Sequence, residues 1–274
     1  MIHLASDGLA LALDPARGMV ATSLRHGDEE LLAPSRARRE EIVRVDTVRG
    51  MPLLAPWANR LPGDRYPAHG RTVDLGALPI ERDPAGLPLH GTLTGRGDWV
   101  VLEHRRDAVV AGVQLDEDAV TAAAFPFAAR LQVEWRLGGD ALEVTTTLLA
   151  TGGDVVPACF GWHPYLVLPD ADRSACTVRL PGGAPEPVGP DTVDTPIALA
   201  DDREAVLAGA RRTLTLTLGP GYGALQVWMP AGEPFVSLEP MVAPTGALAT
   251  GHHPVARPGA PYRATFRLDV RGTA

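Results

Sequence analysis

Hydrophobic and polar residues alternate with a period of two in segments that recur from one end of the chain to the other. Such alternation predicts half-buried β-strands, because successive side chains of a strand point to opposite faces of its sheet. Gly, Pro or Asp residues bound these segments, as expected for turns between strands. The clearest segments are 9–13, 130–137, 213–218 and 262–270, and further ones are 99–105, 108–115, 141–151, 224–229 and 235–240.

Helical periodicity is nearly absent, and the best candidate for a helical turn is segment 201–208. We therefore predict an all-β fold, and nothing supports the alternating βα units of a dinucleotide-binding fold. The lack of a repeat of fixed length argues against a propeller or a solenoid and favours a large antiparallel β-sandwich. Segment 51–66 is rich in Pro and turn residues, and segment 181–196 is predicted to be a long surface excursion. Because strands continue on both sides of segment 181–196, we expect residues 1–274 to form a single domain.

The net charge of −8 argues against nucleic acid or an anionic membrane as a partner, because clustered cations bind phosphate groups. The net charge is more compatible with a small neutral ligand. The chain contains no lysine, which excludes a Schiff-base lysine and a phosphate-loop lysine. Its two cysteines cannot form a disulfide framework or a four-cysteine zinc site. With no signal-peptide pattern and no run of roughly 18 apolar residues, we expect a cytoplasmic protein.

The segment CFGWHPYLVLP, residues 159–169, places the ionisable His163 among aromatic, aliphatic and proline residues. A histidine in such a run is most often a core residue whose ring nitrogens have backbone partners. A catalytic role requires a second titratable group of opposite function and a group that binds a substrate. The rest of the chain therefore decides between these two interpretations.

Glu239 is the best candidate for the second titratable group. It ends the apolar segment FVSLE, where a carboxylate costs free energy unless it is hydrogen-bonded or functional. Desolvation there raises the pKa of a carboxyl group toward the range of a general base. The alternative is a Glu paired with an Arg at the end of a strand.

Two short segments carry candidate ligand-binding residues. Asn59 and Arg60 lie in a loop with several prolines, and Arg60 could present its planar donors to sugar hydroxyls or to a carboxylate. The alternative is a tight turn at Asn59 beside a surface Arg. His90 precedes Gly91 at a break between strands, which is either a turn or a point where the backbone approaches a ligand.

The segments PWANR, LHG, FGWHPY and LEPMVAPTGALATG occur in the order and approximate spacing of the aldose 1-epimerase (galactose mutarotase-like) family, which the chain resembles over nearly its whole length. The resemblance implies a β-supersandwich with an open cleft, a general acid at His163 and a general base at Glu239. It also implies that His90 and Arg60, with Asn59 beside Arg60, bind the sugar. Family members carry a further substrate-binding aspartate, and Asp201 in LADDREAV is the nearest match, although its surroundings differ from the family pattern.

The implied reaction interconverts the α and β anomers of an aldose. One group takes the proton from O1 while another gives a proton to the ring oxygen, and the two roles exchange when the ring closes. In this implied mechanism Glu239 starts ionised and His163 starts protonated, and no metal or other cofactor is needed. Trp57, Trp162 and Trp228 are candidate walls for the apolar face of a pyranose, or else core residues.

Three other functions stay open on sequence grounds. Two histidines and a glutamate could form the two-histidine, one-carboxylate metal site of some β-fold enzymes, although no close ligand spacing supports it. A sugar-binding or regulatory protein could keep the cleft without turnover. A hexose 6-phosphate epimerase is less expected, because the chain has no basic cluster for a phosphate group.

Overall fold

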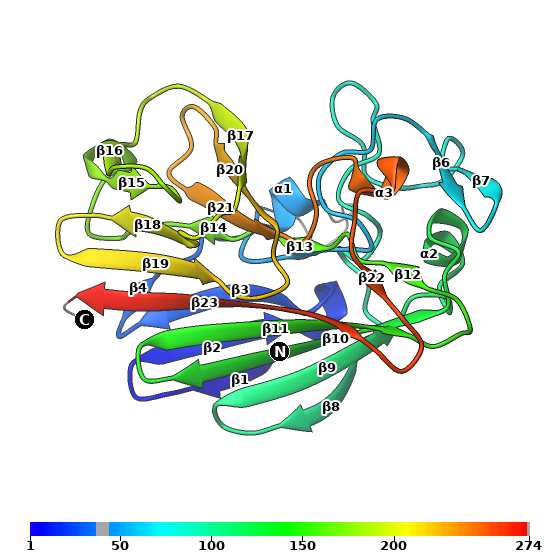
Figure 1. Cartoon of the computed structure of the whole chain (residues 1–274). Helices are drawn as coiled ribbons and strands as arrows, with labels where there is room; N and C mark the ends of the chain where they lie inside the picture. The colour runs from blue at the N-terminus through cyan, green and yellow to red at the C-terminus, as the bar shows by residue number, and fades with distance from the viewer. Residues whose placement is uncertain (37–43, 273–274) are drawn as a thin grey trace.

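The structure, a computed structural model, describes residues 1–36 and 44–272. Antiparallel strands dominate this part of the chain and form two large sheets with smaller ones beside them (Figure 1). The predicted all-β fold is therefore confirmed. The alternating segments identified in the sequence are strands, and their ends differ from the predicted ends by at most one residue in most cases.

The largest sheet has nine strands. Its strand β10 buries every second residue from Ala129 to Leu137, which is the pattern that the alternation predicts. In spatial order the strands are β16 (Glu186–Pro187), β15 (Thr177–Arg179), β18 (Glu204–Ala208), β19 (Arg212–Leu218), β23 (Tyr262–Gly272), β11 (Ala141–Ala150), β10 (Ala129–Gly138), β9 (Ala108–Gln114) and β8 (Val100–His104).

The second sheet has six strands, and several of them are short. Its strand β21 is buried at every position, so it lacks the alternation of a half-exposed strand. The strands are β17 (Val193–Ala198), β20 (Ala224–Met229), β21 (Val236–Met241), β13 (Gly161–Trp162) and β5 (Leu53–Leu54) in spatial order, with β14 (Tyr165–Leu166) also paired to β21.

The remaining elements are small. A four-stranded sheet contains β1 (Ile2–Ala5), β2 (Leu9–Asp14), β3 (Val20–His26) and β4 (Glu29–Glu30), and two-stranded sheets contain β6 (Arg65–Ala68) with β7 (Arg71–Asp74) and β12 (Val156–Pro157) with β22 (Val255–Ala256). The helices are α1 (Val45–Val48), α2 (Ala119–Ala124) and α3 (Ala247–Thr250), with 3-10 turns at Pro15–Arg17 and Arg173–Ala175.

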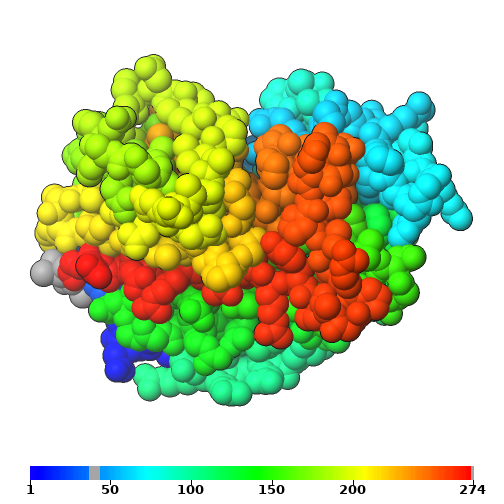
Figure 2. All heavy atoms as spheres, viewed as in Figure 1, coloured from blue at the N-terminus to red at the C-terminus, as the bar shows by residue number. Residues whose placement is uncertain are grey.

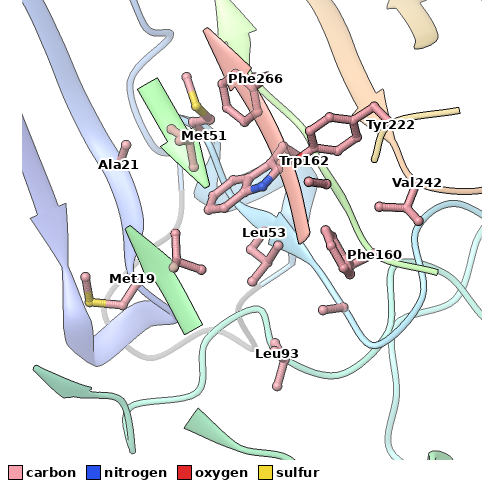
Figure 3. Packing of buried hydrophobic residues seen from close by; sticks show 14 of the residues in the cluster. Met19, Ala21, Met51, Leu53, Leu93, Phe160, Trp162, Tyr222, Val242 and Phe266 are labelled. Carbon is pink, nitrogen blue, oxygen red and sulfur yellow. The ribbon is translucent and has the colours of Figure 1, made fainter. Parts of the chain in front are cut away.

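Aromatic residues join the two large sheets into one core. Trp162 of β13 meets Trp135 of β10 edge to face, with ring centroids 4.9 Å apart, and lies 6.1 Å from Phe266 of β23. Figure 3 shows Trp162 beside Phe266 and Tyr222. The indole Nε1 of Trp162 donates a hydrogen bond to Thr146 Oγ1 (3.0 Å), which satisfies its buried polar group. Trp162 is therefore a core residue, and the next residue, His163, points to the other side of the strand.

One local expectation was wrong. Segment 201–208 has no helical turn; it enters strand β18, whose hydrogen bonds to β15 and β19 override its weak helical pattern. Segment 181–196 is largely exposed, as predicted for a surface excursion, and it contains β16 and the start of β17. Strand β17 matters for the site described below, because it carries Asp194.

Candidate active site

The strand register of the six-stranded sheet places polar and aromatic side chains on one face. Residues directly opposite each other in antiparallel strands share a face. Gln226 of β20 lies opposite Glu239 of β21, and Trp228 of β20 lies opposite Asp194 of β17. Because Gln226 and Trp228 are two residues apart, all four side chains lie on the same side of the sheet.

His163 comes to the same face from the link between β13 and β14. Its backbone N–H donates to the carbonyl of Pro52 (3.0 Å), which continues the pairing of β13 with β5. Its Nε2 atom lies 3.3 Å from Oε1 of Glu239. The two residues are 4% and 2% exposed, respectively. The structure thus brings the two candidate catalytic groups together from positions 76 residues apart in the chain.

Asn59, Arg60 and His90 form the opposite wall. Asn59 and His90 both have left-handed backbone conformations, with φ of 57°, and the N–H of His90 donates to the carbonyl of Asn59 (3.1 Å). Gly91 is required here, because its φ is +73° and an added Cβ would lie 2.2 Å from the carbonyl oxygen of Ala55. Two tight turns held together in this way bring Arg60 and His90 side by side at the cleft.

The guanidinium of Arg60 connects the two walls. Its Nε donates to Asp83 Oδ2 (2.9 Å), and its Nη1 lies 3.5 Å from Asp194 Oδ2. The side-chain oxygen of Asn59 accepts from the backbone N–H of Arg60 (2.9 Å) and from Nη1 (3.3 Å). Asp194 also accepts a hydrogen bond from Nε2 of Gln226 (2.5 Å). Arg60 is therefore oriented by two acids and one amide.

These residues line a cleft of about 470 Å³. Figure 2 shows the upper face of the molecule hollowed between the yellow-green segment that contains β17 and the blue to cyan segments opposite. His163 and Glu239 lie in the lining of this cleft, so a ligand can reach both despite their burial. The lining comprises Arg44, Val45, Asp46, Asn59, Arg60, Glu81, Arg82, Asp83, Pro84, Leu89, His90, His163, Tyr165, Asp194, Gln226, Trp228 and Glu239.

Aromatic rings enclose His163. Tyr165 stacks on it with ring centroids 4.5 Å apart and planes 22° apart, while Trp228 and His90 meet it edge-on at 5.3 and 5.6 Å. The hydroxyl of Tyr165 donates to the carbonyl of Val45 in α1 (2.9 Å), which fixes the stacked ring. Burial in this surrounding lowers the pKa of His163 to about 3.

The carboxyl group of Glu239 is shifted in the opposite direction. Burial and the nearby Asp194 raise its pKa well above the usual range, and Arg60 opposes the shift. Burial therefore acts against the charged form of both groups, His163 and Glu239. The expected start, with Glu239 ionised and His163 protonated, has to overcome this desolvation and stays a prediction.

The structure does not bring Asp201 to the cleft. Asp201 is an exposed residue after the end of β17 and takes no part in the lining. Asp194, seven residues earlier, lies in the lining instead. The alternation of Val193, Thr195 and Ile197 with polar or exposed residues is the signal that could have identified this strand.

Sequence analysis also missed Gln226, Tyr165 and Glu81. Glu81 is the least expected, because its segment has no recognisable pattern. Its Oε2 accepts a hydrogen bond from the N–H of Val45 (3.2 Å), and burial raises the pKa of its carboxyl group to about 7. Of the three candidate aromatic walls, Trp228 lines the cleft, whereas Trp57 and Trp162 are core residues.

In residues 1–36 and 44–272, no group of three or more His, Cys, Asp or Glu side chains is arranged to hold a metal ion. His90, His163 and Glu239 line one cleft without forming such a group. The helices of this same part of the chain are all too short or too polar to cross a membrane.

Comparisons with known proteins agree with this architecture. The sequence profile of the aldose 1-epimerase family matches residues 22–184, which is more than half of the chain. The match includes Asn59, Arg60, His90 and His163, and it ends before Glu239. No curated protein matches the chain.

Solved structures resemble the chain over nearly its whole length. A protein from Synechocystis sp. PCC 6803 is 21% identical, with 99% of this chain and 95% of that chain covered and a TM-score of 0.78. A galactose mutarotase-like protein from Clostridium acetobutylicum is 14% identical, with 99% and 95% covered and a TM-score of 0.79. A galactose 1-epimerase from Lactobacillus acidophilus NCFM is 11% identical, with 99% and 94% covered and a TM-score of 0.71. At these identities the similarity establishes the fold.

Proposed function

The chain belongs to the aldose 1-epimerase family, and from that premise we propose that it interconverts the α and β anomers of a free aldose. The observation that carries this proposal is the 3.3 Å contact between Nε2 of His163 and Oε1 of Glu239 in the lining of one cleft. In an aldose, O1 and the ring oxygen are bonded to the same carbon. An acid and a base that serve them together must therefore lie close to each other, as these two groups do.

In the proposed reaction Glu239 is the base and His163 is the acid. Glu239 takes the proton from the O1 hydroxyl while His163 gives a proton to the ring oxygen, and the bond between C1 and the ring oxygen breaks. The aldehyde then rotates by half a turn, and ring closure returns both protons. Every step conserves protons within the pair, so the site needs no covalent intermediate.

When Glu239 holds a proton and His163 is uncharged, the pair already contains the proton that the reaction needs. Sugar hydroxyls that donate to Glu239 stabilise its charged form, and Arg60 acts in the same direction. Transfer of the proton from Glu239 to His163 across their contact then produces the carboxylate and the imidazolium. Because the pair carries one proton in either arrangement, activity is expected to stay level through neutral pH.

The other wall residues supply the contacts that hold the sugar. Arg60 and His90 offer donors to the ring and its hydroxyls, Asn59 orients Arg60, and Asp194 accepts from a hydroxyl. Trp228 offers a ring face for the apolar side of a pyranose. The arginine of this set is paired with Asp83 and Asp194, which favours an unphosphorylated sugar over a sugar phosphate.

Polarimetry on freshly dissolved α-glucose and α-galactose tests the proposal. We expect the purified protein to bring the rotation to equilibrium faster than buffer does, and we expect His163→Asn to lower this rate by about 10²- to 10⁴-fold. His69→Asn is a matched control, because His69 lies outside the cleft and asparagine tolerates its φ of 50°. A wild-type rate equal to the buffer rate, with sugar still bound, would instead identify a sugar-binding protein without turnover.

A further inference from the structure

Glu81 is a carboxyl group in the cleft that the proposed reaction does not use. The carbonyl of Glu81 accepts a hydrogen bond from the N–H of Leu89 (2.9 Å), which fixes its backbone beside the wall that carries His90. The side chain leaves this wall, because its Oε2 accepts from the N–H of Val45 (3.2 Å), the first residue of α1. Glu81 therefore joins one wall of the cleft to α1.

Val45 has hydrogen bonds on both sides of its backbone. Its N–H donates to Glu81, and its carbonyl accepts from the hydroxyl of Tyr165 (2.9 Å). Val45 and Tyr165 are both buried, and they pack in one apolar cluster with Phe235. Helix α1 thus lies against the six-stranded sheet (Figure 1), and its first residue links the carboxyl group of Glu81 to the hydroxyl of Tyr165.

Tyr165 extends this link to His163. The two rings stack with centroids 4.5 Å apart and planes 22° apart, and Phe235 meets the tyrosine ring edge-on at 4.9 Å. The hydroxyl contact with Val45 then sets where the tyrosine ring lies against the imidazole. This placement matters because Nε2 of His163 faces Oε1 of Glu239 at 3.3 Å. A misplacement of about 1 Å in such a pair can cost about 10²-fold in rate.

The charge of Glu81 strengthens its bond to Val45. Burial raises the pKa of Glu81 to about 7, the N–H of Val45 lowers it, Asp46 raises it and Arg44 lowers it. A hydrogen bond to an ionised acceptor is roughly twice as strong as one between neutral groups. The N–H of Val45 therefore favours the ionised carboxylate, and the ionised carboxylate holds Val45 more tightly.

We propose that Glu81 is a positioning residue for His163. It acts through the backbone of Val45 and the ring of Tyr165. This inference rests on the proposed function, and it adds a residue that acts on the general acid from outside the reacting atoms. Without the carboxyl group, the buried N–H of Val45 loses its acceptor, α1 shifts, and the imidazole leaves its alignment with Glu239. The loss then falls on kcat rather than on KM.

Polarimetry with a free aldose separates positioning from sugar binding. We expect Glu81→Leu, which has a similar size and no acceptor, to lower kcat by about five- to twentyfold and to leave KM within about twofold of wild type. Glu81→Gln keeps an oxygen that accepts from Val45, so it should restore kcat to within about threefold of wild type. A raised KM at unchanged kcat would make Glu81 a sugar-binding residue and would overturn the proposal.

Tyr165→Phe breaks the same link at its other end, because it keeps the stacked ring and removes only the hydroxyl. We expect it to lower kcat as Glu81→Leu does, and the double variant should lose little more than either single variant. Losses that multiply, or an unchanged kcat in Tyr165→Phe, would overturn the proposed link even if Glu81→Leu fails to fold. Asp202→Leu is the control, since its carboxyl accepts from the N–H of Gly182 (2.8 Å) outside the cleft.

A measurement without sugar makes the test independent of turnover. The NMR signals of the His163 imidazole, assigned by their loss in His163→Asn, report on its stacking through the ring current of Tyr165. Glu81→Leu should shift these signals in the same direction as Tyr165→Phe, whereas Asp202→Leu should leave them in place. If no aldose equilibrates faster than in buffer, the proposed function fails, and shifted signals still support the positioning role. Unshifted His163 signals in Glu81→Leu would overturn that role.

Discussion

Glu143 in the nine-stranded sheet and Glu239 in the six-stranded sheet are the same residue type in very different surroundings. Glu143 of β11 lies opposite Arg267 of β23 and is partly exposed. Glu239 of β21 is buried, and its nearest ionisable group is His163. Desolvation sets the second carboxyl group apart, because it raises the pKa of Glu239 well above the usual range.

The sheets themselves explain this difference. The nine-stranded sheet has half-exposed strands such as β10, whose alternate residues reach the surface. The six-stranded sheet has strand β21, which is covered on both faces by the core and by the walls of the cleft. One sheet therefore mainly holds the molecule together, and the other holds ionisable groups away from water.

Glu239→Gln is expected to have the largest effect on activity. It removes the base without changing the size of the side chain, so we expect the anomerisation rate to fall by about 10²- to 10⁴-fold in polarimetry. Glu143→Gln is the control in the other sheet and should leave the rate within about twofold of wild type. Equal rates for Glu239→Gln and wild type would exclude Glu239 as the base.

Trp135→Ala tests the structural role of the nine-stranded sheet. Trp135 is fully buried against Trp162, and its truncation should lower the free energy of unfolding by about 3–5 kcal/mol. Denaturant titration measures this change. The activity per folded molecule should stay near the wild-type level. A loss of activity without a loss of stability would contradict the division of structural and catalytic roles between the two sheets.

The pH dependence of stability tests the proton state of the pair. The unfolded chain has pKa values of 4.5 for Glu239 and 6.5 for His163, and folding raises the first and lowers the second. Between these pH values the folded and unfolded pair each bind one proton, so the contribution of the pair is level. Below pH 4.5 the unfolded pair binds one proton more, and above pH 6.5 it binds one fewer, so stability falls on both sides by up to about 1.4 kcal/mol per pH unit.

Two variants separate the acid and alkaline parts of this dependence of stability on pH, measured in denaturant titrations at several pH values. Glu239→Gln should remove the alkaline fall, since only the carboxyl group causes it. His163→Asn should remove the acid fall, which the imidazole causes. If neither variant changes the profile, the folded pair has ordinary pKa values and the desolvation argument is wrong.

The smallest expected effect compares two aspartates. Asp194 contacts Arg60 and Gln226 in the cleft, so we expect Asp194→Asn to raise KM for the aldose by about three- to tenfold through loss of one charged hydrogen bond. Asp201→Asn, on the exposed segment after β17, should leave KM unchanged within about twofold. The reverse result would return the sugar-binding role to Asp201.

Much of the fold could be predicted from the chain, because the burial pattern of a half-exposed strand depends on residues two positions apart. Segments 130–137 and 213–218 illustrate this, since each became a strand with the predicted buried face. The prediction of a helical turn in segment 201–208 was wrong, because hydrogen bonds from neighbouring strands decide the conformation of this segment. For the site, His163 and Glu239 were found by their motifs, whereas Asp194 has no motif and depends on its pairing with β20.

The amino-acid sequence alone therefore determined the all-β class, the buried faces of its longer strands and the family to which its motifs belong, since these depend on residues near each other in the chain. Only the folded molecule decided that Asp194 rather than Asp201 lies in the cleft with His163 and Glu239, and that burial shifts the pKa values of this pair in opposite directions. Cross-strand register and desolvation depend on what packs against a residue, and those partners come from distant parts of the chain.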